Sequence, residues 1–197
     1  MPRQMPAQKP GRSVQEVRTP PEFLAAVKSM LHVADFDCDL AATDDNTVAD
    51  LYYTEAENAL VQAWPREGGW NWLNPPFGDL APWVAKAWRE AGRGVQTAML
   101  VPAGVGANWW RDWVHLKARV LLLNGRLTFV GHPTPYPKDL CLLLYGPPTA
   151  FRATFPDYTV WVWRANAWGP SAAPSAVVAH PARGPRRAAG RRRGPRG

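Results

Sequence analysis

The sequence is poor in the residues that build metal centres and disulfide frameworks. Its 197 residues include only two cysteines and four histidines, and these are scattered along the chain. Two distant cysteines without a neighbouring histidine make a poor zinc site, and they are typical of a reduced, cytosolic chain. No Ser–His–Asp or Cys–His arrangement is legible. We therefore expect no metal and no nucleophilic triad.

Long hydrophobic runs are also absent. A membrane-spanning helix needs about 18 consecutive apolar residues, whereas the longest runs here are the short leucine-rich stretches 120–123 and 142–144. No apolar segment follows Met1, so we expect no secretory signal. A hydrophobic content of 46% is nevertheless sufficient for the core of one ordinary domain.

Acidic residues are missing from the end of the sequence. Seven arginines and no acid follow Pro181. Without them the chain has 16 basic and 16 acidic residues, so the body is formally neutral and the net charge of +7 belongs to the tail. Such a tail is either a sequence-independent tether for nucleic-acid phosphates or a solvated appendage.

Composition divides the chain into three segments. Residues 1–18 are rich in Pro, Gln and Arg and have no hydrophobic period, which predicts a disordered arm. Residues 166–197 are an Ala/Pro/Gly/Arg stretch of low complexity, also expected to be disordered. The domain between them, 19–165, carries most of the eleven tryptophans, which we expect in the core or in groove walls.

Helical and strand patterns alternate within the domain. Thr19 and Asn108 are expected to cap the first and third of the helices predicted at 20–32, 80–91 and 108–116. Strands are expected at 35–42, 68–73, 95–101, 118–123, 140–145 and 158–163. This alternation predicts an α/β fold, a mixed, mostly parallel sheet with helices on both faces.

The tetrapeptide Asn74-Pro75-Pro76-Phe77 follows one of these strands. Its prolines fix two φ angles and remove two N–H donors. The Asn74 side chain and the Pro75 carbonyl remain as acceptors on a stiff turn beside the Phe77 ring. Open α/β sheets bind ligands at this end of their strands. The turn therefore suits a flat ligand with an amino group, although it can also be a simple strand terminator.

The chemistry that such a turn supports is transfer of a methyl group to an exocyclic amino group. The amino nitrogen of a purine is a poor nucleophile because its lone pair is delocalised into the ring. Two acceptors aimed at its hydrogens favour a more tetrahedral nitrogen, and Phe77 can stack on the base. A methyl group on a sulfonium is already activated, so transfer needs mainly positioning. A base in duplex DNA must first be flipped out of the stack.

A cofactor pocket is suggested by the stretch 36–42, which places acids and small residues at the end of a strand. Small side chains let a cofactor approach the backbone, and Asp39 can hold its amino group or orient the loop. A solvated acid at a strand end is the plainer interpretation. Thr19-Pro20 can lie against the same pocket or can simply begin a helix.

Several motifs occur in one order between residues 18 and 150. They are Thr-Pro-Pro-Glu (19–22), Phe-Asp-x-Asp-x-Ala-Ala (36–42), Asn46, Tyr53-Thr54, Asn58-Ala59-Leu60, Trp64, Asn-Pro-Pro-Phe-Gly (74–78), Leu-Val-Pro-Ala (100–103), Trp109-Trp110 and Gly125-Arg126-Leu127-x-Phe129. The ordered set resembles the phage and prophage DNA N6-adenine methyltransferases of the Dam-like type. The Asn-Pro-Pro-Phe box alone also occurs in enzymes that methylate other planar nitrogens, including protein glutamine.

The resemblance implies a Rossmann-like class I methyltransferase fold. It implies a cytoplasmic enzyme, in the host cell of a phage or prophage, that uses S-adenosylmethionine to methylate adenine N6 in double-stranded DNA. The implied catalytic residues are Asn74, Pro75, Pro76 and Phe77. The implied cofactor residues are Thr19, Pro20, Asp37, Asp39, Ala41 and Asn58. Asn58 stands where relatives often have an acid, and Leu40-Ala41-Ala42 replaces the glycine-rich loop of larger methyltransferases.

DNA contacts are expected from residues outside these two sets. Arg126 belongs to a motif of the family and is expected to contact a phosphate or the partner base, or else to form a turn and an ion pair. The tryptophan-rich helix 108–116 and the loop 131–138 are the expected groove readers, with Trp109, Arg111 and Lys138 as contacts.

Two alternatives stay open at this point. One is a methyltransferase for another planar nitrogen in RNA or protein. The other is a non-catalytic nucleic-acid-binding protein whose tryptophans stack on bases. The recognition sequence, the oligomeric state and the biological role, whether host mimicry, self-protection or regulation, do not follow from the sequence.

Overall fold

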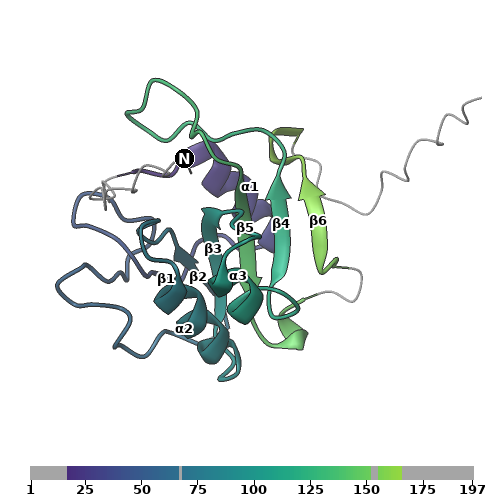
Figure 1. The fold of residues 1–197 in the computed structure, drawn as a ribbon. Helices are drawn as coiled ribbons and strands as arrows, with labels where there is room; N and C mark the ends of the chain where they lie inside the picture. Colours follow the sequence, from purple (N-terminus) through teal and green to yellow (C-terminus); the bar gives the residue numbers. More distant parts are fainter. Residues whose placement is uncertain (1–16, 67, 152–154, 166–197) are drawn as a thin grey trace, which may run out of the picture.

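The computed structural model describes residues 17–66, 68–151 and 155–165, and its centre is one six-stranded sheet (Figure 1). The order of the strands across the sheet is β1-β2-β3-β5-β4-β6. Their bounds are β1 Cys38–Asp39, β2 Trp70–Leu73, β3 Gln96–Pro102, β4 Arg119–Leu123, β5 Leu140–Tyr145 and β6 Tyr158–Trp161.

Five strands run in one direction, and β5 alone runs against them. The pairs β1–β2, β2–β3 and β4–β6 are parallel, whereas β5 is antiparallel to both of its neighbours, β3 and β4. The carboxyl ends of β1, β2, β3 and β4 therefore meet at one edge of the sheet. The predicted mixed, mostly parallel sheet is confirmed.

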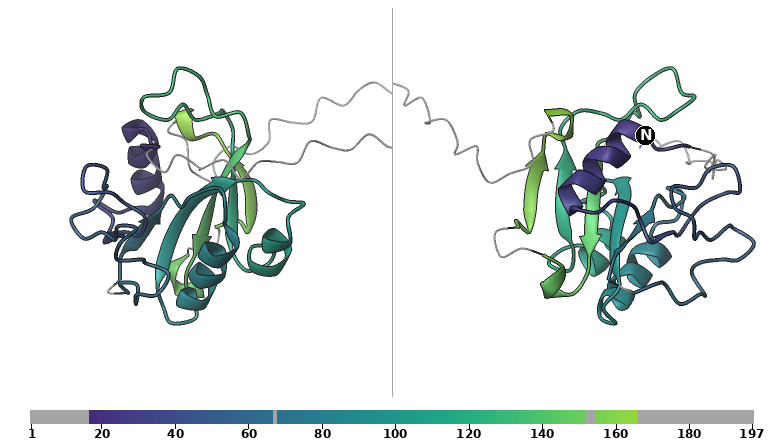
Figure 2. Two further views of the ribbon diagram at one scale, coloured as in Figure 1. Left: turned by 60° about the vertical axis from the view of Figure 1, so that its left-hand side comes forward. Right: turned by 180° about the vertical axis from the view of Figure 1, so that it is seen from behind.

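Helices cover both faces of the sheet (Figure 2). Helix α1, Pro21–Leu31, lies on one face. Helices α2, Ala81–Ala91, and α3, Asn108–Trp113, lie on the other. Two short 3-10 turns, η1 Pro148–Ala150 and η2 Trp163–Ala165, flank β6. The α/β class with helices on both faces is thus as predicted.

Alternation along β2 supplies side chains to two separate hydrophobic cores. Trp70 and Trp72 point to the α1 face, where they join Phe23. Leu73 points to the opposite face, where it meets Val84 of α2. Successive side chains of a strand point to opposite faces of its sheet. A central strand covered on both sides is therefore apolar almost throughout.

The first core is organised around one phenylalanine. The Phe23 ring lies 5.8 Å from Trp161 and 5.2 Å from Trp163, measured between ring centroids. It is also edge-on to Trp72 at 6.5 Å. The contacts with Trp163 and Trp72 are edge-on, a favoured geometry of aromatic pairs, and the contact with Trp161 is tilted. They fix α1 across the sheet and so place the residues before it, 17–20, at the carboxyl edge.

Several predicted boundaries were wrong. The helix cap predicted at Thr19 is Pro20, whose carbonyl accepts the Phe23 N–H at 3.0 Å. The cap predicted at Asn108 is Ala107. Residues 35–42 contribute only the two-residue β1, because Asp39 bends the chain after it through side-chain contacts described below.

Residues 17 and 18, which we placed in the disordered arm, belong to the folded body because Arg18 forms an isolated bridge with Val130. The remainder of the predicted arm and the predicted tail lie outside the described residues. Among the described residues, no helix has the length and apolar character to cross a membrane. Both cysteines, Cys38 and Cys141, are buried and free.

Candidate active site

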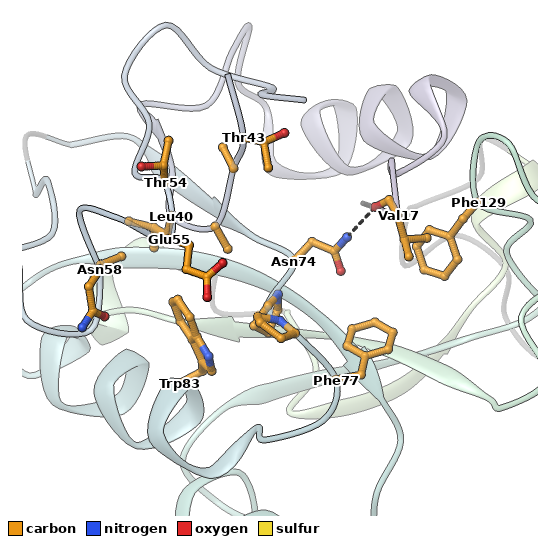
Figure 3. Close-up of a pocket in the computed structure, with 15 residues that line it drawn as sticks. Val17, Leu40, Thr43, Thr54, Glu55, Asn58, Asn74, Phe77, Trp83 and Phe129 are labelled. Carbon is orange, nitrogen blue, oxygen red and sulfur yellow. Dashed lines mark hydrogen bonds between the residues drawn. The ribbon is translucent and has the colours of Figure 1, made fainter. Parts of the chain in front are cut away.

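A cavity of about 380 Å³ opens at the carboxyl edge of β1 and β2. Volumes of this size are typical of small-molecule sites. Figure 3 shows the side chains that surround it, which come from segments far apart in the sequence. The lining residues are Val17, Leu40, Ala41, Ala42, Thr43, Thr54, Glu55, Asn58, Ala59, Asn74, Pro75, Pro76, Phe77, Trp83 and Phe129.

Asn74 stands at the end of β2 with its amide held from one side. Its Nδ2 donates to the Val17 carbonyl and to the Thr19 hydroxyl, each at 3.3 Å. A carbonyl can only accept, so the nitrogen must face Val17 and the oxygen must face away from it. The Asn74 Oδ1 is buried and has no hydrogen-bond partner. Asn74 thus lines the cavity, and the direction of its unpaired acceptor is fixed.

The Phe77 ring forms another wall, and two aromatic rings support it. Its centroid lies 5.5 Å from Tyr136 and 6.4 Å from Phe129, both in edge contact. Tyr136 and Phe129 are themselves 5.8 Å apart. The connection from β4 to β5 supplies both rings. It therefore packs against the Phe77 ring and fixes its position beside the stiff Pro75-Pro76 turn. A flat ligand can stack on such a ring.

The turn after β1 brings small residues to the cavity, and Asp39 shapes this turn. The Asp39 carboxylate accepts the Ala41 N–H at 3.2 Å and the Val48 N–H at 3.1 Å. Burial raises the pKa of Asp39 to about 6, and these two backbone hydrogen bonds counteract part of that rise. Asp39 does not itself line the cavity. It orients Ala41 and Ala42, which do.

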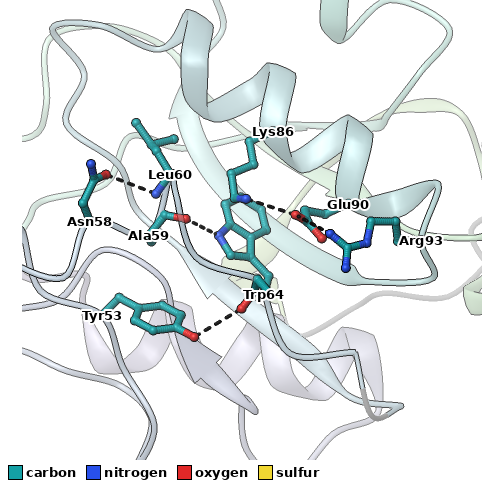
Figure 4. Close-up of polar contacts among 9 residues, drawn as sticks. Tyr53, Asn58, Ala59, Leu60, Trp64, Lys86, Glu90 and Arg93 are labelled. Carbon is teal, nitrogen blue, oxygen red and sulfur yellow. Dashed lines mark hydrogen bonds and ion pairs between the residues drawn. The ribbon is translucent and has the colours of Figure 1, made fainter.

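The segment from Tyr53 to Trp64 forms the third wall and is anchored to α2 (Figure 4). The buried Trp64 indole N–H donates to the Ala59 carbonyl at 2.8 Å. Lys86 of α2 lies over the Trp64 ring, 5.2 Å from its centroid, and pairs with Glu90 at 3.0 Å. The cavity-lining Asn58 adopts a left-handed φ of 52°, which asparagine tolerates well.

The predicted catalytic residues are brought together, but the predicted cofactor residues are divided. Asn74, Pro75, Pro76 and Phe77 line the cavity, as do Ala41 and Asn58. Thr19 and Pro20 are buried beside it. Asp37 precedes β1, and its carboxylate lies so close to Gly69 that a Cβ there would stand 2.0 Å from Oδ1. Asp37 is thus outside the cavity lining.

Among the lining residues that sequence reasoning did not name as site residues are Val17, Glu55, Trp83 and Phe129. The Glu55 carboxylate points into the cavity in Figure 3, beside the Trp83 ring. A signal existed for two of them. Glu55 follows the Tyr53-Thr54 motif, and Phe129 ends the Gly125–Phe129 motif. Val17 and Trp83 gave none, because only the fold brings the residues before α1 and the first turn of α2 to this edge.

The predicted DNA-contacting residues separate into two kinds. Trp109 and Lys138 line one open groove that shares Phe77 with the cavity. Arg111 pairs with Asp112 at 2.7 Å, and Arg126 lies 3.8 Å from Asp139. The structure thus contains an ion pair of Arg126, which the sequence analysis gave as the alternative to a DNA contact. Within the described residues, no group of three or more His, Cys, Asp or Glu side chains could hold a metal.

The fold and the site together define a class. A mostly parallel sheet with helices on both faces and a ligand-sized cavity at its carboxyl edge, lined by an Asn-Pro-Pro-Phe turn, is a Rossmann-like α/β fold with its cavity where such sheets bind ligands.

Comparison with known proteins then identifies the family. The family described as DNA N-6-adenine-methyltransferase (Dam) matches residues 9–139, and the chain belongs to this family. The matched stretch begins within the predicted arm and ends just before β5.

Two phage proteins are among its relatives. A DNA N-6-adenine-methyltransferase of Escherichia phage T1 is 28% identical over 110 residues, which are 56% of this chain and 45% of that protein. A DNA N-6-adenine-methyltransferase of Haemophilus phage HP1 is 28% identical over 106 residues, 53% of this chain and 60% of that protein. The matched part of the chain thus spans about half the length of these relatives.

Proposed function

We propose that this protein transfers a methyl group from S-adenosylmethionine to the N6 amino group of an adenine flipped out of double-stranded DNA. The observation that carries the proposal is the buried, unpartnered Oδ1 of Asn74 at the cavity. An unpaired buried acceptor costs free energy on the order of 1–3 kcal/mol. A ligand amino group would satisfy it. Membership of the Dam family supports the choice of adenine N6 as that group.

The residues of the cavity fit S-adenosylmethionine, which the family uses. When bound, this cofactor supplies a methyl group on a positively charged sulfur. The small side chains of Ala41 and Ala42 leave room for a ligand against the backbone, and Asp39 fixes their turn. Glu55 and Asn58 offer polar groups on the same side, and Trp83 offers an apolar wall. We assign these residues to the cofactor half of the cavity.

The residues around Asn74 act on the base. We propose that Asn74 Oδ1 and the Pro75 carbonyl accept the two N6 hydrogens, while the Phe77 ring stacks on the purine. Hydrogen bonds from both hydrogens draw the nitrogen toward a tetrahedral shape and free its lone pair. The nitrogen gains one methyl group and loses one proton to solvent. The enzyme's contribution is positioning and orientation, for which effective molarities of about 10⁵ M or more are known.

The DNA contacts are proposed from position. Trp109 and Lys138 line the groove that begins at Phe77. A DNA strand whose flipped adenine occupies the cavity would therefore pass these two residues. We keep Arg111 and Arg126 as phosphate contacts that must exchange their acidic partners for DNA. The place of action would be the cytoplasm of the cell that carries the phage or prophage.

Methyl transfer tests the proposal directly. The full chain is incubated with labelled S-adenosylmethionine and, in separate reactions, double-stranded DNA, RNA or a protein mixture, and the nucleic acids are digested to nucleosides. Label in N6-methyladenine from DNA is expected. Asn74→Ala should reduce transfer at least about 100-fold, because a positioned acceptor is lost. The matched control Asn124→Ala, after β4, should transfer normally.

Two outcomes would reject the proposal. Label only in RNA or protein would leave a methyltransferase with another substrate. DNA binding without label in any acceptor would leave a nucleic-acid-binding protein. Normal turnover by a correctly folded Asn74→Ala variant would remove Asn74 from the mechanism even if DNA were the substrate.

A further inference from the structure

The segment Val17–Thr19 holds the amide of Asn74 from behind. Figure 3 shows the Asn74 nitrogen directed at the Val17 carbonyl and its oxygen directed away. The second amide hydrogen reaches the hydroxyl of Thr19, which is itself buried. Both donor positions of the side-chain amide are therefore occupied by one short segment. The orientation of Oδ1 follows from these two bonds.

The same segment is fixed on both flanks. The Arg18 carbonyl accepts the Val130 N–H at 3.0 Å, which ties the segment to the connection that carries Phe129. The Arg18 guanidinium pairs with Asp45 at 3.0 Å. Asp45 in turn accepts the hydroxyl of Thr43, a lining residue of the cavity, at 2.8 Å. The segment thus joins opposite walls of the site across Asn74.

We infer that Thr19 is a positioning residue for Asn74, and that with the Val17 carbonyl it sets the direction in which Asn74 Oδ1 meets the substrate amino group. This inference rests on the proposed function. It differs from the role that the family resemblance implied for Thr19, which was contact with the cofactor. Thr19 does not line the cavity, whereas its hydroxyl has a direct contact with Asn74.

The two roles have different kinetic consequences. Loss of the Thr19 hydroxyl leaves one Asn74 hydrogen unpaired and lets the amide rotate about χ2. A rotated amide presents Oδ1 to the amino group less often, so kcat falls. The cofactor half of the cavity is unchanged, so its affinity stays the same. A cofactor contact would instead show itself in the dissociation constant of S-adenosylmethionine.

The experiment compares three single variants of the full chain. Thr19→Val keeps the shape and removes the hydroxyl, whereas Thr19→Ser keeps the hydroxyl. Thr159→Val, on β6, is a matched control that loses a hydroxyl far from the cavity. We expect kcat to fall about tenfold in Thr19→Val. Thr19→Ser should recover most of it, the control should equal the wild type, and the Kd of S-adenosylmethionine should be the same in all.

A raised Kd with an unchanged kcat would overturn the inference in favour of a cofactor contact, and no change in either quantity would overturn it as well. If Thr19→Val does not fold, as judged by its thermal melt, Thr19→Ala takes its place. A readout without activity separates this inference from the proposed function. The side-chain amide signal of Asn74, assigned by its loss in Asn74→Ala, should shift and exchange faster in Thr19→Val even if no acceptor is ever methylated. An unmoved signal would reject the positioning role.

Discussion

Asp39 lies next to the cavity, yet its carboxylate faces the backbone of its own chain. Two N–H groups, from Ala41 and Val48, point at it and hold the turn that reaches the cavity. The side chain is almost fully buried, and burial makes the charged form costly. Asp39 therefore shapes the site, and its contribution to the stability of the fold depends on pH.

The raised pKa of Asp39, about 6 in the folded protein against 3.8 in the unfolded chain, makes a prediction about stability. The folded state binds the proton more tightly, so Asp39 stabilises most below about pH 4 and this contribution is lost as the pH rises through 6. The free energy of unfolding of the wild type minus that of Asp39→Asn should fall by about 2 kcal/mol between pH 4 and pH 7. Urea denaturation at several pH values measures it. A difference that does not change with pH would show that burial does not raise the pKa of Asp39.

At the scale of elements, the site is assembled by connections and not by regular strands. The segment between β1 and β2 supplies the wall with Glu55 and Asn58, and its described residues, 40–66 and 68–69, form no strand or helix. Its order comes from a few anchors. Trp64 bonds the Ala59 carbonyl, and the Tyr53 hydroxyl bonds the Ala63 carbonyl at 3.2 Å. Loss of one of these hydrogen bonds should therefore disturb this wall more than loss of one hydrogen bond disturbs a helix.

This dependence predicts an effect of Trp64→Phe. The substitution keeps an aromatic ring under Lys86 and removes the N–H, so the buried Ala59 carbonyl loses its partner. The free energy of unfolding should drop by about 1–3 kcal/mol. Affinity for S-adenosylmethionine should drop with it, because Ala59 and Asn58 line the cavity. Urea denaturation and isothermal calorimetry measure the two quantities.

The matched control for this prediction is Trp88→Phe, on the outer side of α2, where the residue is 39% exposed. Its effect on both quantities should be small. Equal losses of affinity in the two variants would mean that Trp64 acts through general packing and not through the anchored wall.

At the scale of the whole molecule, part of the positive charge of the body is paired with acids. Arg93, Arg111, Arg119 and Arg126 each pair with an acid. Exposed pairs of this kind contribute little to stability and are screened by salt. We therefore propose that the seven arginines after Pro181 supply much of the non-specific attraction for DNA.

Removal of residues 181–197 should therefore weaken DNA binding and flatten its dependence on salt. Each phosphate contact that is lost reduces the slope of log K against log salt by about 0.9. Transfer to a short duplex at saturating concentration should survive. Fluorescence anisotropy at several salt concentrations gives the slope. If the truncated protein kept the slope of the full chain, the tail would be a solvated appendage.

The sequence by itself determined the fold class, the order of the main elements and the Asn-Pro-Pro-Phe turn that lines the cavity. Hydrophobic runs with Gly, Pro and Asn at their ends act locally, so β3, β4, β5 and α2 were predicted nearly to the residue. The resemblance supplied the family. Where contacts between distant segments compete with local preference, prediction failed. Thr19 looks like a helix cap in sequence, but in the structure its hydroxyl bonds Asn74, 55 residues away.

Only the tertiary structure decided what surrounds Asn74. A sequence shows that asparagine has a donor and an acceptor, and it does not show which of them faces the ligand. Val17 and Thr19 occupy both donor positions, and this leaves Oδ1 buried and unpaired at the cavity. The physical reason is that hydrogen-bond direction depends on neighbours that the fold brings together. The tetrapeptide could be recognised from the chain alone, whereas the direction of its acceptor depends on the segment that crosses behind it.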